Sequence, residues 1–65
     1  MEEGYNIWIL EEKPGREAHL KIVLAYWVNK DEFVTWLFNL DSGGLAFGHY
    51  FKNLDNARED FNRRD

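Results

Sequence analysis

FVTWLFNLDSGGLAFGHYF, residues 33–51, is the stretch that decides the fold of this chain. Apolar residues occupy alternate positions on both sides of the turn-forming residues 41–44, which is the pattern of two antiparallel strands in a hairpin. Because side chains alternate between the two faces of a strand, the paired apolar residues would share one face of a sheet. A four-residue turn would produce these pairs: Leu40 with Leu45, Phe38 with Phe47, Trp36 with His49, and Val34 with Phe51.

Two further strands are predicted upstream, over residues 5–12 and 18–28, which are rich in β-branched and aromatic residues. Pro14 and Gly15 stand at the centre of a turn over residues 13–16, and this dipeptide is typical of type II turns. A helix over residues 17–30 is the alternative for the second segment, because Ala, Leu and Lys favour helices. The turn predicts this register: Ile9 opposite Leu20, Ile7 opposite Ile22, and Tyr5 opposite Leu24.

The end of the chain has the composition of a helix over residues 54–64. Asn53 is a suitable N-cap, and Asp55 in the first turn complements the helix dipole. So short a helix is not stable alone, and we expect it to pack on the sheet with Phe61 as its anchor. Its apolar stripe is narrow and consists of Leu54, Ala57 and Phe61. Two ion pairs at i,i+4 spacing are expected in it, Glu59 with Arg63 and Asp60 with Arg64.

These elements predict a single α+β domain over residues 1–65. Its architecture is a four-stranded antiparallel β-meander followed by one C-terminal helix packed on one face. A turn over residues 29–32 would join the two hairpins. A helix beginning at Asp31 is the alternative there, but the alternating apolar pattern of residues 34–40 favours a strand. The predicted strands are residues 5–12, 18–28, 33–41 and 45–51, and the predicted helix is residues 54–64.

One helix covers one face of such a sheet, and the alternation leaves a second face that is also apolar. The face beneath the helix is expected to carry Ile7, Ile9, Leu20, Ile22, Leu24, Trp36, Phe38 and Phe47. The other face is expected to carry Trp8, Leu10, Val23, Ala25, Trp27, Phe33, Leu37 and Tyr50. Either sheet twist shelters these residues, or they form an association surface. The candidate interface residues on this face are Trp8, Leu10, Val23, Trp27, Leu37 and Tyr50.

Length and composition narrow the function classes. Sixty-five residues make one small domain, and such a domain buries only roughly 60% of its unfolded surface. The absence of cysteine excludes disulfides and thiolate metal sites, so three Trp, three Tyr and five Phe must supply the packing. The acidic N-terminus lacks the apolar core of a secretory signal, and no apolar run is long enough to cross a membrane. A cytoplasmic location is therefore expected.

The residues that carry catalysis or bind metals are scarce. Ser42 is the only serine and lies in a predicted turn, while His19 and His49 fall on opposite predicted faces. No serine–histidine–acid arrangement and no cluster of metal ligands follows from these positions. The glycines match no phosphate-binding pattern, and Gly48 within a strand indicates a bulge or the close approach of an aromatic ring. We therefore expect no enzyme activity, no cofactor and no metal.

The sequence favours a small non-enzymatic interaction module that binds itself, as a homodimer, or a protein partner through its aromatic sheet face. The first alternative is a single-stranded nucleic-acid-binding module, in which Trp8, Trp27 and Tyr50 would stack on bases. The predicted topology resembles the layout of the PC4-like single-stranded-DNA-binding family, although a net charge of −4 opposes contacts to phosphate. The second alternative is an acidic phage or mobile-element protein that inhibits a host protein.

Overall fold

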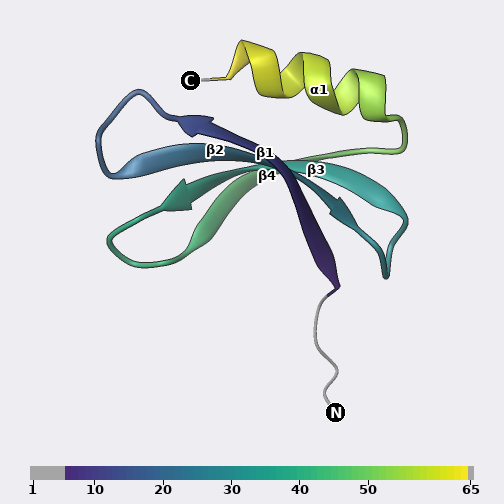
Figure 1. Ribbon diagram of the computed structural model, residues 1–65, viewed down its shortest axis with the longest axis horizontal. Coiled ribbons are helices and arrows are strands. Elements are labelled where there is room, and N and C mark those ends of the chain that lie inside the picture. The colour runs from purple at the N-terminus through teal and green to yellow at the C-terminus, as the bar shows by residue number, and fades with distance from the viewer. Residues whose placement is uncertain (1–5, 65) are drawn as a thin grey trace.

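The computed structural model describes residues 6–64. Four antiparallel strands lie side by side in chain order, and one helix follows them. Figure 1 shows the helix across one face of a strongly twisted sheet, whose hairpins spread out beneath it. The predicted fold class, a four-stranded antiparallel meander with a C-terminal helix on one face, is therefore confirmed. The elements are β1 (Ile7–Pro14), β2 (Leu20–Trp27), β3 (Glu32–Asn39), β4 (Leu45–Phe51) and α1 (Leu54–Arg63).

Helix α1 begins and packs as its sequence predicts. The side chain of Asn53 accepts a hydrogen bond from the backbone N–H of Asn56 at 3.1 Å, which caps the first turn. Ala57 and Phe61 are buried against Ile22 and Leu24 of β2. Helix α1 thus covers the face of the sheet that carries these two β2 residues. Within residues 6–64, no helix is long and apolar enough to cross a membrane.

The register predicted for the first hairpin is wrong. Strand β1 continues through Pro14, which pairs with Lys21, so residues 13–16 do not form the predicted type II turn. Proline is tolerated at this position because β1 is an edge strand of the sheet. The strand also contains a β-bulge at Leu10, between the pairs Ile9–Ala25 and Glu11–Leu24.

The bulge at Leu10 changes which face each half of β1 presents. An extra residue in one strand shifts the alternation of side chains by one position. Ile7 and Ile9 therefore share a face with Ala25 and lie opposite the helix, against the prediction. Beyond the bulge Glu11 lies on the helix side, where it forms an ion pair with Arg58 of α1.

The register predicted for the second hairpin is also wrong. Phe38 pairs with Leu45, because β3 ends at Asn39 and Leu40 belongs to the connecting loop. The side chain of Asn39 sets this loop by accepting hydrogen bonds from the backbone N–H groups of Asp41 and Ser42, at 2.9 and 3.1 Å. Such a turn consumes more residues than the predicted turn of residues 41–44.

The pairing of β3 with β2 reverses the predicted faces of β3 and, before the shift near Gly48, of β4. Phe33, Thr35 and Leu37 lie on the helix side, since Thr35 pairs with Leu24 and Leu37 with Ile22. Val34, Trp36 and Phe38 lie on the opposite side, which the helix leaves uncovered. The core consequently has two layers. The layer beneath α1 is built on Ile22, Leu24, Ala57 and Phe61, and the layer on the uncovered side is built on Val23, Ala25, Val34 and Trp36.

Candidate interaction surface

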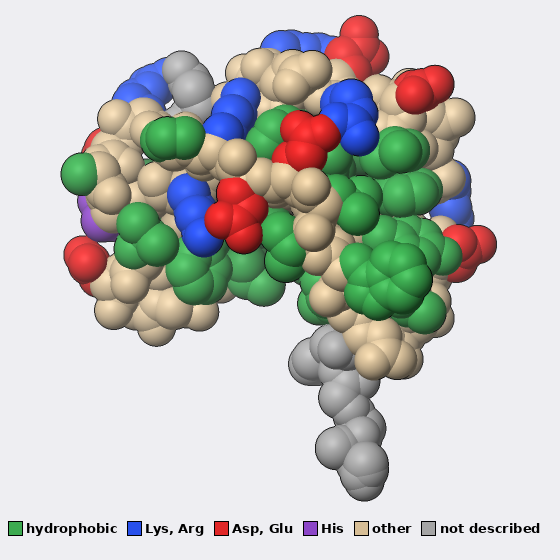
Figure 2. All heavy atoms as spheres, viewed as in Figure 1, with side chains coloured by type: hydrophobic (Ala, Val, Ile, Leu, Met, Phe, Trp, Pro, Cys, Tyr) green, Lys and Arg blue, Asp and Glu red, His purple; other side chains and the backbone are tan. Residues whose placement is uncertain are grey.

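An apolar groove runs along the side of the sheet that α1 does not cover. Its volume is about 360 Å³, and its charged lining residues are Glu12 and Lys21. Figure 2 shows a hollow between the start of β1 and the β3–β4 turn, with hydrophobic side chains on its walls. The twist of the sheet creates this concavity, because it turns the start of β1 and the β3–β4 turn away from the helix on either side of β2 (Figure 1). The apolar lining residues are Ile7, Ile9, Val23, Trp36, Phe38 and Leu45.

Exposed apolar side chains lie along the rim of this groove and on the neighbouring part of β4. Ile9 is 52% exposed and Leu45 is 49% exposed, and they lie on opposite walls. On β4, Phe47 is 72% exposed and Tyr50 is 51% exposed. We call this surface, defined by Ile9, Trp36, Leu45, Phe47 and Tyr50, the open face.

Three aromatic rings, one each from β2, β3 and β4, pack together beside the groove. Trp27 and Trp36 have ring centroids 6.0 Å apart, and Tyr50 lies 6.5 Å from the first and 6.4 Å from the second. Gly48 makes this packing possible, because a Cβ atom there would meet Trp36 Nε1 at 2.7 Å and the Tyr50 hydroxyl at 2.9 Å. The expectation that Gly48 marks a bulge or the approach of an aromatic ring is confirmed, since the register of β4 shifts there.

The charged side chains near the open face lie against other side chains. Lys21 Nζ lies 2.7 Å from a carboxylate oxygen of Glu12 and 5.4 Å from the ring centroid of Phe38. Lys30 Nζ lies 5.2 Å from the ring centroid of Trp27. The Glu12–Lys21 pair is close to neutral, whereas Lys30 keeps its positive charge over the ring of Trp27. The whole chain carries −4.

The six candidate interface residues do not lie on one surface. Val23, Trp27 and Tyr50 are on the uncovered side, where Val23 is buried and Tyr50 is exposed. Leu37 is partly buried beneath α1. Trp8 and Leu10 lie on the helix side, in a separate cleft that also includes Leu54 of α1. Ile9, Trp36, Leu45 and Phe47 complete the open face instead. The bulge at Leu10 explains the position of Ile9, and the pairing of β3 with β2 explains those of Trp36 and Leu45.

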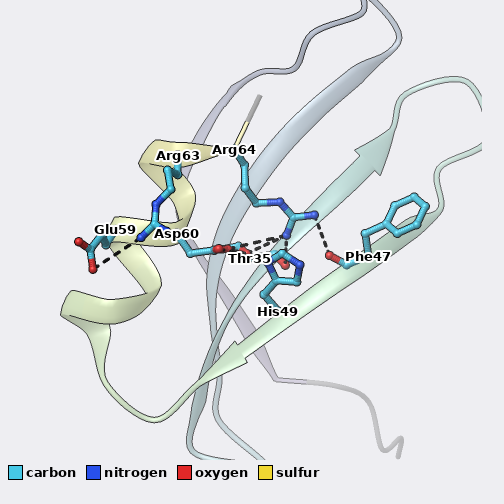
Figure 3. A network of polar contacts seen from close by, with 7 residues as sticks. All are labelled: Thr35, Phe47, His49, Glu59, Asp60, Arg63 and Arg64. Atoms are coloured by element: carbon cyan, nitrogen blue, oxygen red, sulfur yellow. Dashed lines mark hydrogen bonds and ion pairs between the residues drawn. The ribbon is translucent and has the colours of Figure 1, made fainter.

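Behind the open face, a polar network joins α1 to β3 and β4 (Figure 3). The fully buried Thr35 donates a hydrogen bond from its hydroxyl to a carboxylate oxygen of Asp60, at 2.6 Å. His49 Nδ1 lies 3.0 Å from the same oxygen. Arg64 contacts Thr35 twice, donating to its hydroxyl at 2.9 Å and to its backbone carbonyl at 3.1 Å. The buried polar groups of Thr35 are thereby satisfied, as burial requires.

Arg64 also connects this network to the open face. Its second guanidinium nitrogen donates to the backbone carbonyl of Phe47 at 2.8 Å, while the ring of Phe47 points away from the network (Figure 3). Phe47 has φ of 54°, a left-handed conformation that costs a non-glycine residue roughly 1–2 kcal/mol. The hydrogen bond from Arg64 therefore helps to hold the bulge that presents the Phe47 ring to solvent.

The position of His49 differs from the prediction. It pairs with Thr35 on the helix side, where it meets Asp60, and does not lie beside Trp36 on a common face. Within residues 6–64 no group of three or more His, Asp or Glu side chains is placed to hold a metal ion. The sequence does contain one sign of the network: Asp60 and Arg64 share the helical spacing of the buried Ala57 and Phe61. The predicted pair Asp60–Arg64 forms, with a nitrogen–oxygen distance of 4.0 Å, and it faces the sheet.

Acid should weaken this network. Burial raises the pKa of Asp60. Hydrogen bonds from Thr35 and His49, together with the charges of His49 and Arg64, lower the pKa by more than burial raises it, so the pKa lies below its usual value. A lowered folded-state pKa contributes stability above the unfolded pKa of about 3.9, and this stability is lost as pH falls through the folded value. We expect Asp60→Asn to lose less stability than wild type between neutral pH and acid, measured by urea unfolding at several pH values. Exposed Glu59→Gln is the control, and an equal acid loss in Asp60→Asn and wild type would contradict the prediction.

Comparison of the chain with protein families, with characterised proteins and with solved structures gives no match. The function must therefore be argued from the surface itself.

Proposed function

We propose that this chain is a small non-enzymatic interaction module whose open face associates with a second copy of itself. The observation that carries this proposal is the exposure of Ile9 and Leu45 on the walls of an apolar groove, with Phe47 and Tyr50 also exposed on β4. Large apolar side chains gathered at one concave surface are typical of a protein–protein interface. Their burial would add apolar packing to a domain that is too small to bury much of its own surface.

The charges near the open face favour a second copy over other occupants. A two-fold symmetric interface brings one patch against its own copy, so the patch must be complementary to itself. The rim offers one acid and one base, Glu12 and Lys21, which already lie 2.7 Å apart and can face the same pair in a second copy without like-charge repulsion. A nucleic acid would need several cations beside the aromatic rings, and the net charge of −4 opposes its approach.

The proposal is tested by solution mass, measured by sedimentation equilibrium from micromolar to millimolar protein. We expect a mass near twice 7.8 kDa that falls on dilution. Leu45→Ser and Tyr50→Ser should each weaken the dimer at least about fivefold, because central interface residues contribute more than about 1 kcal/mol each.

Trp8→Ser is the matched control, because Trp8 is 63% exposed but lies on the other side of the sheet. Its dimer affinity should equal that of wild type. A mass of one chain at every concentration would overturn the proposed self-association. Fluorescence quenching by a single-stranded oligonucleotide that disappears at high salt would favour the nucleic-acid alternative.

A further inference from the structure

A second aromatic cleft lies on the helix side of the sheet, apart from the open face. Its volume is about 320 Å³, and it lies between β1, the β2–β3 turn and the first residue of α1. In Figure 2 hydrophobic side chains gather in this region, below the right-hand end of the helix. Its lining residues are Trp8, Leu10, Tyr26, Asp31, Phe33 and Leu54.

Three aromatic rings follow one another across this cleft. The rings of Trp8 and Tyr26 have centroids 6.1 Å apart and planes inclined at 67°. Tyr26 and Phe33 follow at 4.9 Å and 41°. The inclined rings form walls of different orientation, and Trp8, at 63% exposure, is open to solvent. Aromatic faces carry negative electrostatic potential, so such walls attract a cation.

Asp31 adds a carboxylate to the same cleft. Its Oδ1 accepts a hydrogen bond from the Tyr26 hydroxyl at 2.6 Å, which holds the carboxylate beside the rings. This hydrogen bond, followed by burial and the negative charge of Asp31, raises the pKa of Tyr26 above its usual value. The phenol therefore stays protonated and continues to donate to Asp31 at physiological pH.

Within the described part of the chain, no cation is seen at this carboxylate or over these rings. Lysines lie over the rings of Phe61, Phe38 and Trp27, which belong to other parts of the molecule. Among residues 6–64, no lysine lies over an aromatic ring of the cleft, and no Lys or Arg forms an ion pair with Asp31. As far as residues 6–64 are concerned, this meeting point of three aromatic rings and a carboxylate is open to an external cation.

The chemistry of the lining restricts which cation fits. Among the lining residues that the structure describes, Asp31 is the only charged one, and Leu10 and Leu54 are apolar. A primary ammonium group would leave strongly bound water and find few acceptors to replace it. A methylated ammonium group is weakly hydrated, and its methyl groups pack against aromatic and aliphatic walls. We propose that this cleft binds a quaternary or N-methylated ammonium group, such as a trimethylated lysine side chain or a choline headgroup.

Choline is the probe for this proposal, and its neutral isostere 3,3-dimethylbutan-1-ol is the control ligand. The two share shape but differ in charge. ¹⁵N-labelled protein is titrated with each, and the indole N–H signals are followed, with the Trp8 signal assigned from a Trp8→Phe variant. We expect choline to shift the Trp8 signal in a saturable manner and to bind at least about fivefold more tightly than the neutral alcohol, in keeping with a cation–π contact.

Variants test the two parts of the cleft separately. Trp8→Leu and Asp31→Asn should each weaken choline binding by roughly 2- to 30-fold, the range for an exposed to a desolvated cation–π contact. Tyr50→Ser, on the open face, should leave the affinity unchanged, so this inference stands or fails independently of the proposed dimer. Equal binding of choline and its neutral isostere, or no shift of the Trp8 signal, would overturn the inference. Spectra of the free variants report whether each one is folded.

Discussion

Replacing Phe61 with alanine is expected to lower the free energy of unfolding by about 3–5 kcal/mol, the usual cost of truncating a buried aromatic side chain. Phe61 is 4% exposed and packs with Ile22 and Leu24 beneath α1. The helix has only Ala57 as a second buried residue, so other contacts cannot replace the lost packing. Such a loss is a large share of the stability that a domain of this size can have. Urea unfolding followed by circular dichroism measures it.

Phe47→Ala is the matched control for this prediction. The same substitution at a side chain that is 72% exposed removes little buried area and should change the unfolding free energy by less than about 1 kcal/mol. Since Phe61 also lies 5.1 Å from Lys13 Nζ, Phe61→Leu separates the cation–ring contact from packing and should recover most of the stability. A loss in Phe61→Ala no larger than that in Phe47→Ala would mean that the helix does not depend on this anchor.

Gly48→Ala is expected to destabilise the protein by about 1–3 kcal/mol, the typical cost of inserting a group into a packed site. The added methyl group would meet the indole nitrogen of Trp36 at 2.7 Å and the hydroxyl of Tyr50 at 2.9 Å. Trp36 is 6% exposed and packs against Trp27, so its ring cannot move without disturbing the uncovered layer of the core. Thermal unfolding would report the loss, and the proposed dimer should weaken in parallel.

Two further variants isolate this steric cause. Gly44→Ala is the control, because a Cβ atom there meets only Ser42 Oγ at 3.4 Å and should be nearly neutral. In a Gly48→Ala/Tyr50→Phe double variant, removal of the hydroxyl should recover part of the stability through a favourable coupling. Purely additive effects, or a Gly48→Ala protein as stable as Gly44→Ala, would show that the contact with Tyr50 is not the cause.

The elements of the fold follow from local patterns. Alternating apolar residues predicted β3 and β4, and the N-cap at Asn53 with the stripe ending at Phe61 predicted α1. These signals depend on residues a few positions apart, so they survive an error in how strands pair. Val23, Trp27 and Tyr50 could likewise be assigned to one face, and the structure places them on the uncovered side.

The register and the complete site required the tertiary structure. A β-bulge has no strong sequence signature, yet each one reverses the face of the side chains on one side of it relative to those on the other. The bulge at Leu10 moved Ile7 and Ile9 to the uncovered side, and the earlier end of β3 and the shift near Gly48 altered β4. Trp8 and Leu10 consequently belong to a cleft of their own.

The sequence by itself determined the number, type and order of the elements, because the 2- and 3.6-residue periods of its apolar residues are local properties of the chain. Only the tertiary structure decided which residues meet across the sheet. The contacts among Thr35, Asp60 and Arg64 join residues from β3 and from the end of α1, and they depend on a register that no local period encodes. The open face and the aromatic cleft are both products of that register.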